Sequence, residues 1–380
     1  MKILHLIVDH QVVERTLSFY EKVFPGCNAV IIFSDKEEFK HLCRYNSCLR
    51  ICRNNLKRKG KNYDFSGVDY IVAHFLTLEM IDFIEYAPKD IHVSWEIYGY
   101  DLYDQFLAPL GYTLEYVDRK KYYSTFTKIL DRFSLLEFVS FLRYHNKSQF
   151  SFIRRKYFDK ITNRLNSVSG SKCNAQILEH YSGKTFYFYQ TFCYSLKETL
   201  GCLYGMVFYE SSNVLIGNSC SLTNNHLYIL EFIKDFELGD SHIIMPISYG
   251  GFPRYKKVLV KNYSNFFPNR IRFIVDYMPL EEYNKIFLDL KTIVVASWRE
   301  ESFGTIIMGL YLGIKIVMSN KSPVFLSLKD EGFRIFAIED ISNAEFVKPL
   351  SIEDKVYNRC LLLRNYSEEK FIGELKRQFV

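Results

Sequence analysis

The chain has 380 residues, a formal net charge of +6, 48% hydrophobic and 24% charged residues. This composition is too apolar for a disordered protein, and the length suits two domains better than one. The apolar run at the start is short and soon meets His5 and Asp9, and no window of about 18 residues is free of charge. We therefore expect neither a signal peptide nor a transmembrane helix, and we expect a cytoplasmic protein.

The nine cysteines form an odd, scattered set without a CxxC pair. This spacing suits reduced thiols better than a disulfide framework, and it does not provide the paired ligands of a structural zinc site. We predict no metal site and no bound cofactor.

In the first half of the chain, short apolar runs alternate with amphipathic stretches. The runs predicted to be strands lie at residues 2–8, 28–34, 68–75 and 90–95. Strands that alternate with helices predict a parallel sheet covered on both faces.

The last of these runs leads into "WEIYGYDLYD", which places Glu96, Asp101, Gly99 and four aromatic rings within ten residues. If the run is a buried strand, this stretch is a loop at the strand's carboxyl end, where open α/β sheets bind ligands.

A basic region follows at 119–160, where eleven Lys and Arg residues alternate with Tyr and Phe. It is either a solvated helical pair with aromatic core faces or a surface that binds anionic lipid headgroups. Nucleic acid is the less favoured partner because no nucleic-acid-binding motif occurs.

After about residue 160 the strand and helix pattern starts again, with predicted strands at residues 213–219, 241–248, 271–278, 291–298 and 314–319. The sequence therefore predicts two doubly wound, Rossmann-like α/β domains facing each other across a cleft. We place them at 1–205 and 206–350, with a helical segment at 351–380 that packs back on the first domain.

Two predicted strand-to-helix turns of the second domain can receive a diphosphate. One contains Gly217, Asn218 and Ser219, and the other contains Ser302, Gly304 and Thr305. Small residues permit close approach, and a helix N-terminus offers backbone N–H groups and positive potential. The alternative for each turn is a plain helix cap.

Three more side chains belong to the same predicted edge. Glu301 would lie near a sugar or ribose hydroxyl rather than near a phosphate, because its carboxylate would repel the phosphate. Tyr249 and Tyr277 each follow a predicted strand and either frame a flat base or serve only in packing. GxGxxG, Walker A, HExxH and GxSxG motifs are absent from the sequence, which removes the commonest dinucleotide, NTPase, metalloprotease and hydrolase functions.

The order of five blocks over about residues 90 to 320 resembles a known family. The blocks are "WEIYGYDLYD", "IGNSCSLTNNH", "MPISYGG", "MPLEEY" and "ESFGTIIMGLYLGIKIV". They are similar to the TDP-4-acetamido-4,6-dideoxygalactose (Fuc4NAc) transferase family of bacterial glycosyltransferases, also labelled 4-alpha-L-fucosyltransferase. The sequence departs from the family at Glu96, Tyr98, Glu300 and Glu301, and these departures bear on the sugar accepted.

The resemblance implies a metal-independent GT-B hexosyltransferase. It would move a deoxyamino sugar from a nucleotide sugar, TDP-linked by first choice and UDP- or GDP-linked otherwise. The acceptor would be an undecaprenyl-diphosphate-linked saccharide in bacterial surface polysaccharide synthesis. The enzyme would then lie peripherally on the inner face of the plasma membrane.

The family's motifs, together with the positions of residues at predicted strand ends, suggest roles for single residues. The residues expected to bind the donor are Gly217, Asn218, Ser219, His226, Tyr249, Tyr277, Glu301, Ser302, Gly304 and Thr305. The acceptor side would hold Asp9, His10, Trp95 and Gly99, with Asp101 as the catalytic base and Glu96 as the second candidate.

Two alternatives remain open from the sequence. Asp101 could only cap the helix that follows it. The whole chain could be a non-catalytic nucleotide-sugar or polysaccharide-binding protein on the same scaffold, or a GT-B epimerase or phosphorylase.

Overall fold

The computed structural model describes residues 1–36, 38–42, 48–118, 122, 147–191 and 195–379. The chain forms two compact units, each described here by itself. So far as it is described, unit 1 comprises Met1–Tyr112, Asn146–Ser195 and Glu368–Val380, and unit 2 comprises Thr113–His145 and Leu196–Ser367.

The described part of unit 1 contains a seven-stranded sheet whose strand pairs are parallel. Its strands are β1 (Ile3–Ile7), β2 (Asn28–Phe33), β3 (Leu49–Ile51), β4 (Tyr70–His74), β5 (His92–Glu96), β6 (Ser167–Gly170) and β7 (Tyr187–Gln190). They lie in the order β3-β2-β1-β4-β5-β6-β7. Because the order reverses between β1 and β4, the ligand-binding switch point of this sheet lies at the carboxyl ends of these two strands.

Unit 1 also contains helices, most of which connect these strands. They are α1 (Gln11–Val23), α2 (Leu56–Lys61), α3 (Leu78–Ile84), α4 (Tyr100–Leu102), α7 (Lys147–Arg164), α8 (Lys172–Ser182) and α17 (Glu368–Phe379), with a π-helical turn at Tyr103–Leu107. All five residues of β1 are buried, as expected for a strand covered on both faces. The C-terminal helix α17 belongs to this unit because Leu375 and Phe379 pack against Tyr20 and Tyr189 in one apolar cluster.

The described part of unit 2 contains a six-stranded parallel sheet. Its strands are β8 (Asn213–Ile216), β9 (Ile243–Pro246), β10 (Ile271–Ile274), β11 (Leu290–Val295), β12 (Lys315–Met318) and β13 (Phe336–Ala337), in the order β10-β9-β8-β11-β12-β13. Here the order reverses between β8 and β11. The carboxyl ends of these two strands therefore form the switch point of unit 2.

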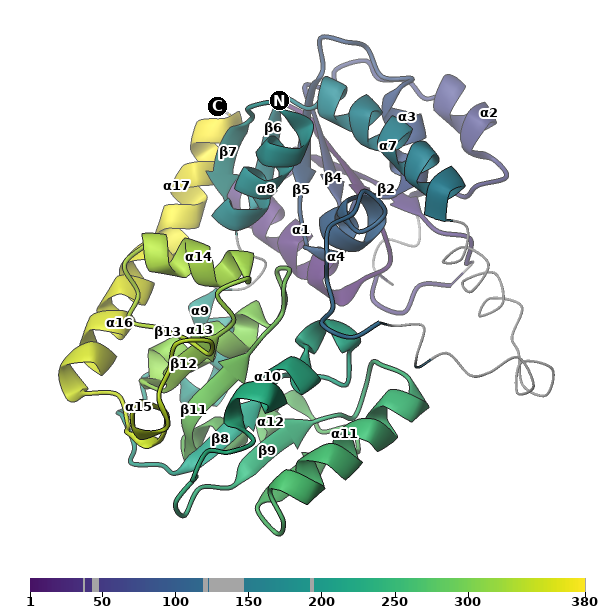
Figure 1. Cartoon of the computed structure of the whole chain (residues 1–380). Coiled ribbons are helices and arrows are strands. Elements are labelled where there is room, and N and C mark those ends of the chain that lie inside the picture. The colour runs from purple at the N-terminus through teal and green to yellow at the C-terminus, as the bar shows by residue number, and fades with distance from the viewer. Residues whose placement is uncertain (37, 43–47, 119–121, 123–146, 192–194, 380) are drawn as a thin grey trace. The chain divides into compact units, whose positions relative to one another are not determined.

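The α-helices described in unit 2 are α9 (Leu196–Leu200), α10 (His226–Ile233), α11 (Pro253–Phe266), α12 (Leu280–Ile286), α13 (Phe303–Leu312), α14 (Pro323–Asp330), α15 (Asn343–Val347) and α16 (Ile352–Asn365). Short 3₁₀ turns occupy Gly201–Leu203, Leu222–Asn224 and Phe287–Asp289. Figure 1 labels these α-helices in the teal to yellow part of the chain.

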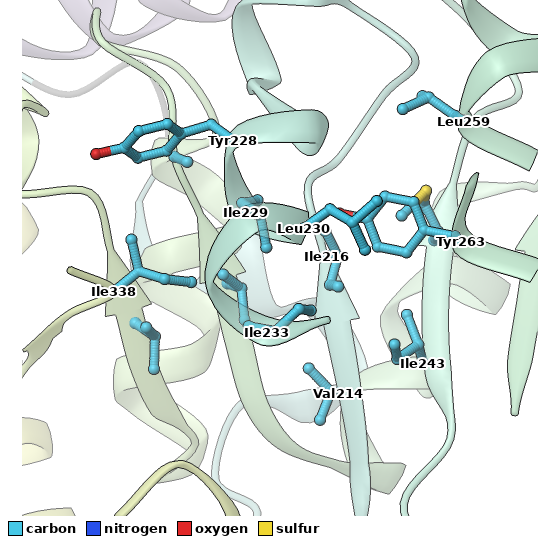
Figure 2. Packing of buried hydrophobic residues seen from close by; sticks show 14 of the residues in the cluster. Val214, Ile216, Tyr228, Ile229, Leu230, Ile233, Ile243, Leu259, Tyr263 and Ile338 are labelled. Atoms are coloured by element: carbon cyan, nitrogen blue, oxygen red, sulfur yellow. The ribbon is translucent and has the colours of Figure 1, made fainter. Parts of the chain in front are cut away.

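Apolar packing fixes α10 on the sheet of unit 2. Ile229 and Ile233 of α10 are buried in one cluster with Val214 and Ile216 of β8 and with Tyr263 of α11 (Figure 2). Burial of such side chains contributes roughly 1.5–3 kcal/mol each. Since α10 is held in this way, its N-terminus lies beside the turn that follows β8.

The predicted fold class, two doubly wound parallel sheets of Rossmann type, is confirmed. The units divide differently from the predicted domains, however. Unit 2 includes the segment Thr113–His145, so far as it is described, and its main segment begins at Leu196 rather than at residue 206, because α9 packs against α13. The C-terminal segment predicted at 351–380 is shared, with α16 in unit 2 and α17 in unit 1.

Candidate functional site

The first predicted phosphate turn follows β8 at the switch point of unit 2. Gly217 has φ +66°, a left-handed conformation that glycine adopts at little cost. A Cβ atom at this position would lie 2.7 Å from His226 Nε2 and 2.9 Å from Asn224 Oδ1. The turn therefore requires glycine both for its backbone and for its space.

An asparagine that the sequence did not single out organises this turn. Asn224 Oδ1 accepts the backbone N–H of Asn218 at 3.1 Å. Asn224 Nδ2 donates to Ser219 Oγ at 3.1 Å and to Glu301 Oε1 at 3.3 Å. Because one amide group binds both predicted turns, the two turns form one structure.

Glu301 closes this structure from the β11 side. Its Oε2 accepts the hydroxyl of Thr223 at 2.6 Å and lies 3.3 Å from Arg299 Nε in an ion pair whose side chains are 12% and 14% exposed. The sequence predicted Glu301 near a sugar or ribose hydroxyl. In the structure its carboxylate is held by protein groups at the same edge of the sheet.

The second predicted turn leads into α13. Ser302 has φ +62° and precedes the helix, whose first turn contains Gly304 and the buried Thr305. A Cβ atom added at Gly304 would meet nothing within 4 Å. Open space therefore lies beside the N-terminus of a helix, where backbone N–H groups and the helix dipole favour an anion.

Three buried polar atoms at this edge have no hydrogen-bond partner among the described residues. They are Asn218 Oδ1, His226 Nε2 and Ser302 Oγ. Unpaired buried polar atoms are costly in a protein without ligand. Each lies on a residue that the sequence assigned to donor binding.

His226 is the first residue of α10 and is fully buried. Burial lowers the pKa of its imidazole to about 3, so the ring is neutral near pH 7. Its Nδ1 lies 3.4 Å from the hydroxyl of Tyr255. A neutral ring can present its other nitrogen, Nε2, to a ligand without adding charge.

The loop after β9 packs tightly against the turn after β8. The backbone N–H of Cys220 donates to the carbonyl of Tyr249 at 2.8 Å, and a Cβ atom at Gly251 would lie 2.0 Å from the Cys220 carbonyl oxygen. The side chain of Tyr249 in this loop is 61% exposed, and that of Tyr277 in the loop after β10 is 86% exposed. Both rings are available to stack against a flat group.

In unit 1, the carboxylate of Asp101 is fully buried and accepts three hydrogen bonds from other residues. Oδ2 accepts Trp95 Nε1–H at 2.7 Å and the backbone N–H of Leu76 at 3.1 Å, and Oδ1 accepts the backbone N–H of Tyr98 at 2.9 Å. Burial raises its pKa to about 6. These bonds join β5, the loop after β5 and the loop after β4, so Asp101 organises this edge of the sheet.

Glu96 ends β5 and is 2% exposed. It accepts the hydroxyl of Thr191 at 2.9 Å and that of Tyr20 at 3.2 Å. Burial raises its pKa to about 7. Both carboxylates named as candidate bases therefore titrate close to neutral pH, and both are enclosed by protein groups.

The four residues predicted on the acceptor side have different surroundings. Asp9 binds the backbone N–H groups of residues 40 to 42, so it orders that loop. His10 caps α1 through Nδ1, which accepts the N–H of Val12 at 3.3 Å. Trp95 is fully buried, and Gly99 has φ +84° at the start of α4.

A cavity of about 160 Å³ opens elsewhere on unit 1, at the carboxyl ends of β2 and β3. Its walls include Asp35, Arg53 and Glu79, with Arg53 NH2 2.8 Å from Glu79 Oε1. None of the predicted site residues lines it. It therefore does not bear on their assignment.

Within the ranges that the structure describes, no group of three or more His, Cys, Asp or Glu side chains could hold a metal ion. In the same ranges, no helix is long and apolar enough to cross a membrane. The predicted lipid-binding region at 119–160 lies largely outside the described residues, which include Tyr122 and the stretch from 147 onward.

Solved structures with the same fold cover nearly the whole chain. A glycosyltransferase from Rickettsia africae has a TM-score of 0.63 and 12% identity, over 99% of this chain and 97% of its own. HepE of Anabaena, solved with UDP and glucose, has a TM-score of 0.61 and 12% identity, over 100% and 99% of the two chains. Sucrose-phosphate synthase from Thermosynechococcus elongatus has a TM-score of 0.58 and 12% identity, over 100% and 98%.

Two doubly wound parallel-sheet units with this similarity define the GT-B architecture, as predicted. The family model described as 4-alpha-L-fucosyltransferase, glycosyl transferase group 56, matches residues 150–353, more than half of the chain. The chain belongs to this family. The protein is a glycosyltransferase that uses a nucleotide sugar, and the predicted family and enzyme class are confirmed.

Proposed function

We propose that the carboxyl edge of the unit 2 sheet binds the nucleoside diphosphate of the donor. The observation that carries the proposal is that the turns after β8 and β11 meet at the switch point and are joined by Asn224. HepE, of the same fold, was solved with UDP and with UDP-glucose, which supports a nucleotide at such a site.

The described residues supply most of what a diphosphate needs. The N-terminus of α13 and the open space beside Gly304 favour an anion, and Arg299 lies close by in its ion pair with Glu301. Ser302 Oγ can donate to a phosphate oxygen, Asn218 Oδ1 can accept from a sugar hydroxyl, and His226 Nε2 can donate or accept according to its tautomer. Tyr249 or Tyr277 can stack on the base.

The proposed site offers a diphosphate partners other than a divalent ion. A leaving diphosphate can be stabilised by fixed backbone N–H groups and the helix dipole. We propose metal-independent transfer on this basis. Activity should survive EDTA, and loss with EDTA that magnesium or manganese restores would contradict this part of the proposal.

The finer parts of the proposed reaction rest on the family. We propose that the sugar is a deoxyamino hexose, that TDP is the preferred carrier, and that the acceptor is an undecaprenyl-diphosphate-linked saccharide of a bacterial surface polysaccharide. We propose a peripheral position on the inner face of the plasma membrane. Positive charge and exposed Phe152, at 73%, on the described part of the basic region support such a position.

We propose that either Asp101 or Glu96 is the base that deprotonates the acceptor hydroxyl. Their pKa values, about 6 and about 7, suit proton acceptance near neutral pH. Asp9 is less suited, because its backbone hydrogen bonds help to hold the pKa of its carboxyl low.

The reaction is tested by following release of nucleoside diphosphate from TDP- and UDP-hexoses, with and without a lipid-linked saccharide extract from bacterial membranes. Release that depends on the extract supports transfer. Donor binding without release under either condition would instead support the non-catalytic binding protein. The variant Gly304→Asp, which should lose donor binding, is the control for nonspecific hydrolysis.

A further inference from the structure

Three aromatic rings form a stacked series at the switch point of unit 1. His10 follows β1, Phe75 follows β4, and Tyr100 follows the β5 loop. The ring centroids of His10 and Phe75 are 5.2 Å apart with an interplanar angle of 27°, and those of Phe75 and Tyr100 are 5.9 Å apart with an angle of 22°. We refer to these three residues as the aromatic platform.

The platform is partly open to solvent. Tyr100 is 49% exposed, His10 is exposed and Phe75 is partly buried. In a protein core, the burial of apolar surface offsets the entropy that such rings lose when they are held in place. These three rings are held in place at an edge of the sheet, where less of their surface is buried. Sheets of this kind bind ligands at this edge.

Phe75 has φ +56°, which bulky side chains rarely adopt. Glycine or asparagine would fit this backbone without strain, so the sequence keeps a phenyl ring at a position that disfavours it. Backbone strain of this kind concentrates at ligand-binding and catalytic positions. The ring itself, rather than the turn, therefore requires an explanation.

Neighbouring groups hold Phe75 in this conformation. Asp101 Oδ2 accepts the N–H of Leu76 at 3.1 Å, and Gln105 Nε2 donates to the carbonyl of Leu76 at 2.6 Å. Both backbone groups of the following residue are thus fixed. The His10 ring is held by its own Nδ1, which accepts the N–H of Val12. Hydrogen bonds therefore hold one ring of the platform and the backbone next to a second.

We propose that the exposed outer ring of the aromatic platform, Tyr100, stacks against one sugar ring of the acceptor saccharide with Phe75 supporting it, and that Asp101 and Gln105 are positioning residues for Phe75. This inference rests on the proposed function, in which unit 2 binds the nucleotide and unit 1 binds the other substrate. A hexose ring has an apolar C–H face and a rim of hydroxyls. Aromatic faces bordered by a few polar groups suit such a ligand.

Polar groups lie at the border of the platform, and those of Thr16 and His74 are buried and bonded to Tyr98. The hydroxyl of Tyr98 lies 2.9 Å from Thr16 Oγ1 and 3.2 Å from His74 Nδ1, and the rings of Tyr98 and Phe75 are 5.9 Å apart. The pKa values of His74 and His10 are lowered, chiefly by burial, so this border carries little positive charge near pH 7. It therefore favours an uncharged sugar ring over a phosphate.

The test uses the full-length protein and ligand-observed saturation-transfer NMR. The probes are methyl glycosides of hexoses and of N-acetylhexosamines, with UDP and TDP titrated separately. The variants are Phe75→Asn, which keeps the backbone conformation, and Tyr100→Ala. Tyr187→Ala is the matched control, because Tyr187 is also 49% exposed in unit 1 but belongs to β7.

We expect at least one glycoside to bind the wild type, and its Kd to rise about three- to tenfold in Phe75→Asn and Tyr100→Ala, a size typical of one aromatic contact. Tyr187→Ala should bind the glycoside as tightly as the wild type does. The melting temperature of Phe75→Asn should lie within a few degrees of that of the wild type. Binding of UDP and TDP should be unchanged in all variants.

Absence of glycoside binding, or equal binding by all variants, would overturn the inference. Loss of UDP and TDP binding in Phe75→Asn would also overturn it, because the platform would then hold the nucleobase. If glycosides bind as expected but UDP and TDP do not bind the wild type, the proposed donor site fails while the platform stands.

Discussion

Asp101 Oδ2 lies 2.7 Å from Trp95 Nε1 and accepts its hydrogen, so a fully buried carboxylate is bonded to a fully buried indole six residues earlier. The same carboxylate accepts the backbone N–H groups of Leu76 and Tyr98. One side chain thereby sets two loops at the switch point of unit 1. A role in positioning and a role in proton transfer predict different results when Asp101 is changed.

The substitution Asp101→Asn separates these roles. An asparagine would place an NH₂ group against at least one of three N–H donors, and a buried donor left unpaired costs about 1–3 kcal/mol. If Asp101 acts by positioning, melting temperature and glycoside affinity fall together with turnover. The measurements are thermal unfolding, saturation-transfer NMR and nucleoside diphosphate release.

If Asp101 is the base, the melting temperature still falls because of the unpaired donor, but turnover should collapse far more than that loss of stability explains, and glycoside affinity should stay close to wild type. A matched control is Asp289→Asn, an acidic residue in unit 2 outside the described site. It should change none of the three readouts by more than the error of measurement.

Glu96 makes a pH-dependent contribution to stability. Its pKa is raised from 4.5 to about 7 in the folded protein, chiefly by burial. The stability that comes from the protonated carboxyl is fully present below pH 4.5 and is lost as the pH rises to about 7. The shift corresponds to roughly 3 kcal/mol as an upper limit.

The variant Glu96→Gln does not titrate at this position. Relative to this variant, the wild type should lose free energy of unfolding between pH 4.5 and 7, as measured by urea denaturation at a series of pH values. A difference between the two proteins that stays constant over this range would contradict the raised pKa of Glu96.

Gly217→Ala should destabilise unit 2. The substitution adds a Cβ atom 2.7 Å from His226 Nε2 and forces a left-handed conformation that costs roughly 1–2 kcal/mol for an ordinary residue. We expect a lower melting temperature and weaker binding of UDP or TDP. The control is Gly239→Ala, whose φ of +60° imposes similar backbone strain but whose added Cβ meets nothing within 4 Å.

Gly239→Ala should share the strain but not the loss of nucleotide affinity. If both variants bound nucleotide as tightly as the wild type, the turn at Gly217 would not belong to the donor site.

The sequence predicts the two sheets because strand runs such as those at β1 and β8 are local signals. It does not predict the order of the strands, since pairing between β1 and β4 or between β8 and β11 is non-local. The switch points therefore become visible only in the structure. The predicted turns at Gly217 and Ser302 lie at one of them, and the sequence alone could not show that Asn224 joins the two.

The acidic residues illustrate the limit of sequence patterns. Asp101 and Glu96 read as candidate catalytic groups because two carboxylates stand among aromatic rings. In the structure, Trp95 and Tyr103 of that stretch are core residues and both carboxylates are buried. The sequence does not single out Phe75, because a backbone φ angle cannot be read from a residue that looks like the ordinary end of an apolar strand.

The basic region is predicted to bind anionic lipid. Its described part includes α7, where Phe152 and Ile153 are 73% and 45% exposed. Each basic residue near an anionic surface contributes about 1 kcal/mol, which salt screens. The protein should cosediment with anionic vesicles more than with neutral ones, and less so as salt increases.

Lys156→Glu in α7 should weaken vesicle binding by more than Lys257→Glu, an equal change of charge at an exposed position in α11 of unit 2. Equal cosedimentation with neutral and anionic vesicles would favour the alternative of a solvated helical face.

The central claim is that the N-terminus of α13 and the turn after β8 bind the donor diphosphate. The most direct measurement is calorimetric titration of UDP and TDP into the wild type, Gly304→Ala and Gly304→Asp. An alanine side chain has room at this position, so Gly304→Ala tests size alone, whereas aspartate adds a negative charge at the helix N-terminus. We predict that Gly304→Asp lowers affinity for at least one of the two nucleotides by tenfold or more, about 1.4 kcal/mol, and that Gly304→Ala lowers it far less. Affinity in Gly304→Asp equal to that of the wild type would contradict the assignment and place the diphosphate elsewhere.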